Sequence, residues 1–201
     1  MRFISKIWAF LKTPSSKPFG LIVFLSMIVG VIGWLGFNAG INATATHEFC
    51  TTSCHEMSWV TDEYEQTIHY KNRSGVRATC ADCHVPKGTD IKDWFDKMLA
   101  KTKAAAELYH YAMGTIDTKE KFEAYRWTMA NSVWDSMRAR GSKECLNCHN
   151  FDHMNPEDQG RMARKRHAKA KQQGKTCIDC HTGIAHEEPE EPDEPEEEEN
   201  S

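Results

Sequence analysis

The chain has 201 residues, and its 25 Lys and Arg against 29 Asp and Glu give a formal net charge of −4. This balance lacks the excess of positive charge that nucleic-acid binding requires, so we expect no nucleic-acid partner. All eight cysteines stand in four closely spaced pairs, which leaves none over for an intermolecular disulfide.

One long apolar segment lies near the N-terminus. Residues 1–18 carry four basic side chains, residues 19–41 are 23 consecutive uncharged and mostly apolar positions, and the first acid is Glu48. As a helix, the apolar run would extend about 35 Å and span a bilayer. The positive-inside rule then predicts a single-pass anchor in a bacterial inner membrane, with residues 1–18 cytoplasmic and everything after residue 42 periplasmic. A cleaved signal peptide is the alternative, but the run exceeds the roughly 7–15 residues of its apolar region.

Glycines recur along this segment, and Gly36-x-x-x-Gly40 has the spacing that lets two membrane helices approach closely. We therefore consider a homo-oligomer, with membrane lipid as the other neighbour of the anchor. Glycine that is merely tolerated in the helix is the alternative.

Residues 47–186 contain the four cysteine pairs, and each pair is followed at once by histidine. Cys-x-x-Cys-His is the attachment signature of haem c, whose iron the histidine coordinates. A zinc site, a redox pair and a disulfide do not require that histidine, so we predict four covalently bound haem c groups. The first motif departs from the pattern, because it encloses three residues. The motifs are Cys50-Thr-Thr-Ser-Cys54-His55, Cys80-Ala-Asp-Cys83-His84, Cys145-Leu-Asn-Cys148-His149 and Cys177-Ile-Asp-Cys180-His181.

Other residues must provide further axial ligands to the irons. His69 and His167 each stand ten or eleven residues before a motif, which suggests a duplicated two-haem unit. His186 follows the last motif closely, and Met57 is two residues after His55, where it can reach the iron of the first motif. The remaining candidates, His47, His110 and His153, are equally compatible with an exposed polar role.

Helical patterns are predicted around residues 57–70, 91–113, 118–140 and 156–173, and no segment alternates like a strand. The expected fold is mainly α: a single N-terminal transmembrane helix plus a loop-rich multihaem cytochrome c domain built from two dihaem units. Residues 187–199 contain ten acids and three prolines, so we expect an acidic disordered tail over residues 187–201.

The chain resembles the NapC/NirT family of membrane-anchored tetrahaem quinol dehydrogenases over nearly all of its length except the acidic tail. The segments that carry the resemblance are residues 48–57 (EFCTTSCHEM), 69–80 (HYKNRSGVRATC), 83–86 (CHVP), 107–109 (ELY), 116–118 (IDT), 144–150 (ECLNCHN) and 176–186 (TCIDCHTGIAH).

The resemblance implies that the protein takes electrons from menaquinol or ubiquinol and passes them to a periplasmic reductase, with nitrate reductase as the expected acceptor. It also implies three bis-histidine haems, which His69, His167 and His186 complete, and Met57 as a ligand of the first haem. Two alternatives stay open: a terminal multihaem reductase of a small substrate, and an electron carrier fed by another protein.

The same resemblance places Lys101 and Glu107 at the quinol site. A lysine can hydrogen-bond a quinol oxygen and a carboxylate can take a proton. The competing interpretation is a solvated helix face, since Lys103 and Glu107 form an i,i+4 pair.

Overall fold

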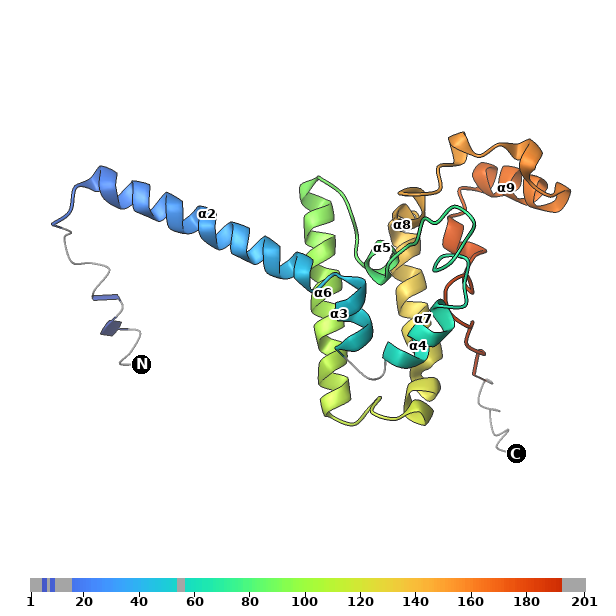
Figure 1. Cartoon of the computed structure of the whole chain (residues 1–201), viewed down its shortest axis with the longest axis horizontal. Coiled ribbons are helices and arrows are strands. Elements are labelled where there is room, and N and C mark those ends of the chain that lie inside the picture. The colour runs from blue at the N-terminus through green and yellow to red at the C-terminus, as the bar shows by residue number, and fades with distance from the viewer. Residues whose placement is uncertain (1–4, 7, 10–15, 54–56, 193–201) are drawn as a thin grey trace, which may run out of the picture. The chain divides into compact units, whose positions relative to one another are not determined.

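The computed structural model describes residues 5–6, 8–9, 16–53 and 57–192, and within these residues all regular structure is helical. The chain divides into two units, Met1–Thr44 and Ala45–Ser201 (Figure 1). The mainly α class predicted from the sequence is confirmed, whereas the organisation into two dihaem units stays a prediction.

The long helix of the first unit is α2, Phe19–Ala43, which is two residues longer than the predicted apolar span. It is long and apolar enough to cross a membrane. The helix follows Pro18, and the Thr44 hydroxyl donates to the carbonyls of Gly40 and Ile41 at 3.2 and 3.1 Å. The Thr44 amide also donates to the Gly40 carbonyl at 3.1 Å, so Thr44 closes the last turn of the helix.

The second unit contains two long helices, α6 and α7, and several short helical segments joined by loops. Two of the four helices predicted here are confirmed as α6 and α7. Asp90 caps the start of α6 and Thr118 caps the start of α7, each through a side-chain oxygen. The elements are α3 (His47–Thr52), α4 (Met57–Tyr64), α5 (Cys80–His84), α6 (Ile91–Ala112), α7 (Lys119–Ala139), α8 (Lys143–Leu146), η1 (Phe151–His153), η2 (Pro156–Asp158), α9 (Arg161–Gln173) and η3 (Cys177–Asp179).

The other two predicted helices are shorter than expected. The helix over 57–70 ends at Tyr64, because both the amide and the hydroxyl of Thr67 bond the Tyr64 carbonyl at 3.0 and 2.8 Å and form a turn. The helix over 156–173 begins only at Arg161, since Asn155 and Pro156 start a separate 3-10 turn. Local capping competes with helix extension at both places.

Few apolar side chains of the described residues are buried. One cluster joins Trp134 and Met137 of α7 to Ile178 of η3, with Cys83 and Trp127 packed against it. The cluster therefore brings the second and fourth cysteine motifs onto the same side of α7. The complete set of buried hydrophobic residues is Tyr64, Ala81, Ile116, Trp134, Met137 and Ile178.

Helix α4, helix α7 and the C-terminal segment meet at a largely buried ion pair between Glu63 and Arg126. Arg126 donates to both carboxylate oxygens of Glu63, at 2.7 Å to Oε1, and to the carbonyl of Glu187 at 2.9 Å. The Glu187 amide donates to Glu63 Oε2 at 2.9 Å. Burial alone would raise the pKa of Glu63, but the bonds from Arg126 and the Glu187 amide outweigh it and lower the pKa.

We expect Arg126→Ala to destabilise the protein by roughly 2–3 kcal/mol, because it leaves the Glu63 carboxylate without its charged partner. Chemical unfolding followed by circular dichroism measures the change. The pKa of Glu63 is lowered in the folded state, so the pair stabilises the fold above the unfolded pKa and the effect disappears as pH falls through the folded pKa. Lys171→Ala, which breaks the exposed Lys171–Asp152 pair, is the control. An equal effect of both substitutions would contradict the assignment.

Candidate functional site

Each fully described cysteine motif forms one helical turn. In the second motif, the amide and hydroxyl of Thr79 both donate to Asp82 at 2.6 Å. In the fourth, the amide and hydroxyl of Thr176 donate to Asp179 at 2.7 and 3.0 Å. This capping box fixes the turn that carries both cysteines and the histidine. The two aspartates were not singled out from the sequence, although Thr-Cys-x-Asp-Cys-His contains the signature.

Three pairs of histidine rings face one another in the second unit. The ring centres are 6.2 Å apart for His69 and His149, 6.2 Å for His84 and His186, and 6.1 Å for His167 and His181. Each pair therefore joins one motif histidine to one histidine outside the motifs. The non-motif members are the three histidines predicted as axial ligands.

The distance within each pair fits two imidazoles that share one metal ion. Two metal–nitrogen bonds of about 2.0 Å, plus roughly 1.2 Å from each nitrogen to its ring centre, add up to about 6.4 Å. Nδ1 of His69 is buried and makes no hydrogen bond to the described residues, whereas His186 interacts with the Val60 backbone. The residues thus fit a haem iron at each pair.

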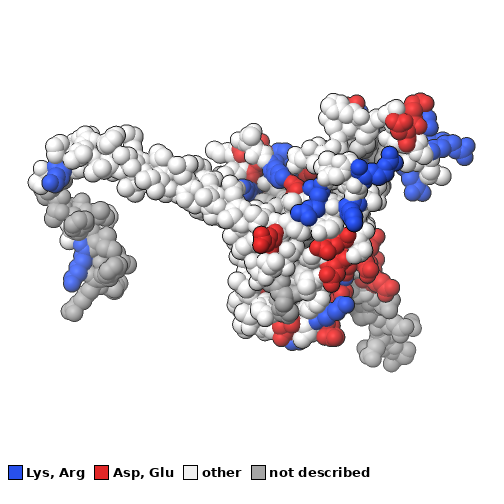
Figure 2. All heavy atoms as spheres, viewed as in Figure 1, with Lys and Arg blue, Asp and Glu red and all other residues white. Residues whose placement is uncertain are grey.

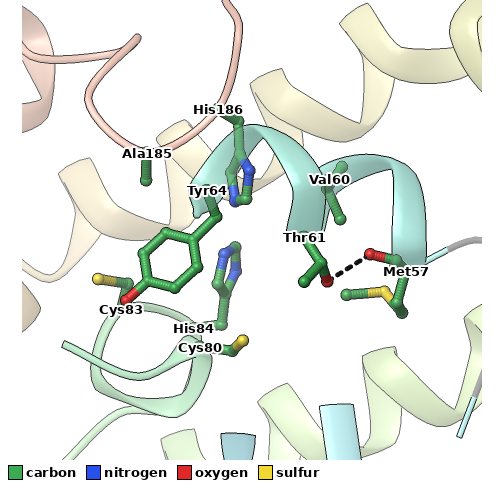
Figure 3. A pocket seen from close by; sticks show the side chains of 9 residues that line it. All are labelled: Met57, Val60, Thr61, Tyr64, Cys80, Cys83, His84, Ala185 and His186. Carbon is green, nitrogen blue, oxygen red and sulfur yellow. Dashed lines mark hydrogen bonds between the residues drawn. The ribbon is translucent and has the colours of Figure 1, made fainter. Parts of the chain in front are cut away.

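The pair His84 and His186 lines a pocket of the second unit. Figure 3 shows the two rings facing each other beside Tyr64, with Cys80 below them. His84 is open to the pocket, but protein surrounds it elsewhere, and this desolvation together with the nearby His186 lowers the pKa of His84 to about 4. Burial also lowers the pKa of His186. Both rings are neutral near pH 7, which is the form that binds a metal.

Further contacts hold the paired histidines in place. Nδ1 of His167 lies 2.8 Å from Oε1 of Gln159, which can only accept, so Nε2 is left for a metal. The Tyr64 hydroxyl donates to the Ala78 carbonyl and, at 3.3 Å, to that of His69. Gln159 and Tyr64 were not predicted as site residues, because side chains that orient a ligand show no pattern in the sequence.

The first motif is described only in part, since Cys54 and His55 lie outside the described residues. Cys50 is on α3, and Met57 begins α4 and lines the pocket that contains His84 and His186 (Figure 3). His47 lies with Nδ1 3.5 Å from Sγ of Cys80. The ligand role of Met57 at the first motif stays a prediction.

The predicted quinol-site residues lie on α6. Desolvation lowers the pKa of Lys101, while Cys50 of the first motif is near enough to act in the opposite direction. Glu107 is exposed, yet partial desolvation by the surrounding protein raises the pKa of its carboxyl group, opposed by His110. The structure therefore brings Lys101 near enough to the first motif for an electrostatic interaction with Cys50.

The remaining candidates do not join a histidine pair. His110 and His153 are exposed, on α6 and η1. The seven described cysteines form no disulfide, and in the described part no three His, Cys, Asp or Glu side chains converge as a zinc site would need. Cysteine motifs, paired histidines and an apolar N-terminal helix together define a membrane-anchored multihaem c-type cytochrome.

Comparison with known proteins gives the family. The family model of the NapC/NirT cytochrome c family, N-terminal region, matches residues 13–191, so the chain belongs to this family, and its four motifs account for four covalently bound haem c groups. The family assignment made from the sequence is confirmed.

Curated relatives match along most of their length. The cytochrome c-type protein NapC of Escherichia coli (strain K12) is 47% identical over 188 residues, covering 93% of this chain and 91% of the relative. The denitrification system component NirT of Stutzerimonas stutzeri is 49% identical, covering 92% and 90%. A putative tetraheme cytochrome-c type protein of Allochromatium vinosum is 50% identical, covering 87% and 92%. No solved structure matches the chain significantly.

The pairing of His69 with His149 can be tested by counting irons that lose a ligand. We expect His69→Ala to convert one haem from low spin to high spin, as measured by electron paramagnetic resonance of the whole protein. The double variant His69→Ala/His149→Ala should affect only one haem. The double variant His69→Ala/His84→Ala should affect two haems. The reverse result would assign His69 to the second motif. His153→Ala, which changes an exposed histidine, should leave the spectrum unaltered.

Proposed function

We propose that the protein oxidises membrane quinol and passes the electrons to a periplasmic reductase in anaerobic respiration, with a nitrate reductase as the first candidate acceptor. Family membership over residues 13–191 supports this class of function. The observation that carries the proposal is that Lys101 is near enough to Cys50 of the first haem motif to interact with it electrostatically, where a lysine could bind quinol beside that haem.

Quinol oxidation releases two protons and two electrons, so the site needs a proton acceptor as well as an electron acceptor. The bound haems supply the one-electron chemistry. Lys101 would hold the quinol oxygen by a hydrogen bond, and Glu107, whose pKa is raised, would take up a released proton. Both residues belong to α6, so one helix would carry the binding group and the proton acceptor.

Electrons would leave at the fourth motif. His167, which faces His181 of that motif, lies on α9, and basic side chains gather over α9 (Figure 2). Such a surface attracts an acidic face of a partner protein and speeds its association. The basic residues of α9 are Arg161, Arg164, Lys165, Arg166, Lys169 and Lys171.

The proposed arrangement places α2 in the bacterial inner membrane and residues 47–186 on the periplasmic side. It is supported by the four basic side chains before the apolar span and by the absence of acids before Glu48. Haem attachment to c-type cytochromes takes place on the periplasmic side, which agrees with this orientation. The acidic segment 187–201 would follow the haem domain, with the backbone of Glu187 held at the Glu63–Arg126 pair.

Stopped-flow reduction of the detergent-purified protein by menaquinol and by ubiquinol tests the proposed function. We expect rapid reduction by at least one quinol and four covalent haems per chain. The haem count also tests whether the first motif accepts haem despite its three-residue spacing. Four haems with no reduction by either quinol would overturn the function and favour a carrier fed by another protein.

Substitutions on α6 test the quinol site separately. We expect Lys101→Ala to slow reduction by quinol about tenfold or more, with reduction by dithionite unchanged, because a hydrogen bond to the substrate is lost. Glu107→Gln should slow the same step and remove the part of its pH profile that follows deprotonation of this carboxyl group, above the ordinary glutamate pKa of 4.5. Lys119→Ala on α7 is the matched control. Unchanged quinol kinetics would remove the substituted residue from the site.

A further inference from the structure

Helix α6 carries an uncharged stripe along its whole length. We define the α6 stripe as Ile91, Phe95, Leu99, Thr102, Ala106 and Tyr109; at about 100° per residue these six positions fall within an arc of about 80°. All six are exposed, and the four large side chains, Ile91, Phe95, Leu99 and Tyr109, are 56–79% accessible to solvent. Exposed large side chains in such a row mark a contact surface.

The opposite face of α6 is the one that packs on the protein. Asp93 is buried and accepts two bonds from Lys143 of α8 at 2.6 and 2.7 Å. Lys97 and Ala100, which share its side of the helix, are half-buried. The α6 stripe therefore points away from the protein over the first half of the helix, and the second half continues the same uncharged arc.

Two lysines, Lys92 and Lys103, follow one edge of the α6 stripe, and the half-buried Lys101 lies about 80° beyond the other edge. Lys92 is additionally paired with Asp96 at 2.6 Å. An apolar face with basic side chains on its borders is the pattern of helices that lie in the headgroup region of a membrane, where the lysines meet anionic lipid.

Helix α6 lies near the helix that follows the membrane-spanning segment in the sequence. Helix α3 begins at His47, shortly after α2 ends at Ala43. Cys50 of α3 is near enough to Lys101 to affect its pKa. The α6 stripe is thus on a helix adjacent to the first element that follows the membrane-spanning segment.

We propose that α6 lies in the plane of the bilayer surface, with the α6 stripe inserted among lipid acyl chains and its flanking lysines at the headgroups. A helix of 22 residues presents about 33 Å of this face to lipid. Lipid would then lie on one face of α6 and the first haem motif beside its other face. This contact does not depend on which molecule the protein oxidises.

Site-specific photo-crosslinking tests the proposal on the full chain with its haems, reconstituted into vesicles of phosphatidylethanolamine and phosphatidylglycerol. The photoreactive residue p-benzoyl-phenylalanine replaces Phe95 or Tyr109 in the α6 stripe, Phe24 in α2 as the positive control, or Tyr125 in α7 as the matched control. Tyr125 is also an exposed aromatic residue, at 48%. We expect lipid adducts at 95 and 109 severalfold above the level at 125, as measured by mass spectrometry.

Two results would overturn the proposal. Adducts at 95 and 109 that do not exceed those at 125, while position 24 is labelled, would show that the α6 stripe does not meet lipid. Crosslinked dimers in place of lipid adducts would assign the stripe to a second copy of the chain. If replacement of Phe95 prevents accumulation of the haem-loaded protein, Ile91 and Leu99 provide the same test in the first half of the stripe.

Discussion

Three pairs of histidine rings, 6.1–6.2 Å apart, join segments that have little buried apolar surface of their own. The polypeptide around them consists largely of short helical turns and loops. In two of the pairs, His69 with His149 and His84 with His186, a ligated iron would bind segments far apart in the sequence. The porphyrin of each haem would supply apolar contacts that the side chains do not. The spacing of the histidine rings is therefore the constraint to which the rest of the haem domain is fitted.

The sequence predicts the local features of this domain better than its long-range contacts. The cysteine motifs are readable from residue spacing, and α6 and α7 from periodicity together with the capping residues Asp90 and Thr118. The helix limits near Tyr64 and Arg161 were wrong, because turns compete there with regular helix. The local sequence is compatible with both a turn and a continued helix at these places, and tertiary contacts decide which one forms.

The candidate site likewise contains residues that the sequence predicts and contacts that it does not predict. His69, His167 and His186 could be selected as ligands from the repeat spacing and the family resemblance, but nothing in the sequence says that His69 faces His149. The bond from His167 to Gln159 and the ion pair of Glu63 with Arg126 were also invisible, because they depend on how distant segments meet. Lys101 was identified through the resemblance alone, and its role stays a prediction; the structure adds that it is near enough to Cys50 for an electrostatic interaction.

The histidine pairs have a consequence for how the two halves of the domain can be made. His69 of the first half faces His149 of the second, and His84 of the first half faces His186 near the end of the domain. With each pair on one iron, neither half would contain all the imidazoles that its own motifs need. Division of the protein at α7 would then not give two self-sufficient modules. The chain has to be synthesised through residue 186 before the second motif can meet its partner, so the order of synthesis along the chain is not the order in which the pairs are completed.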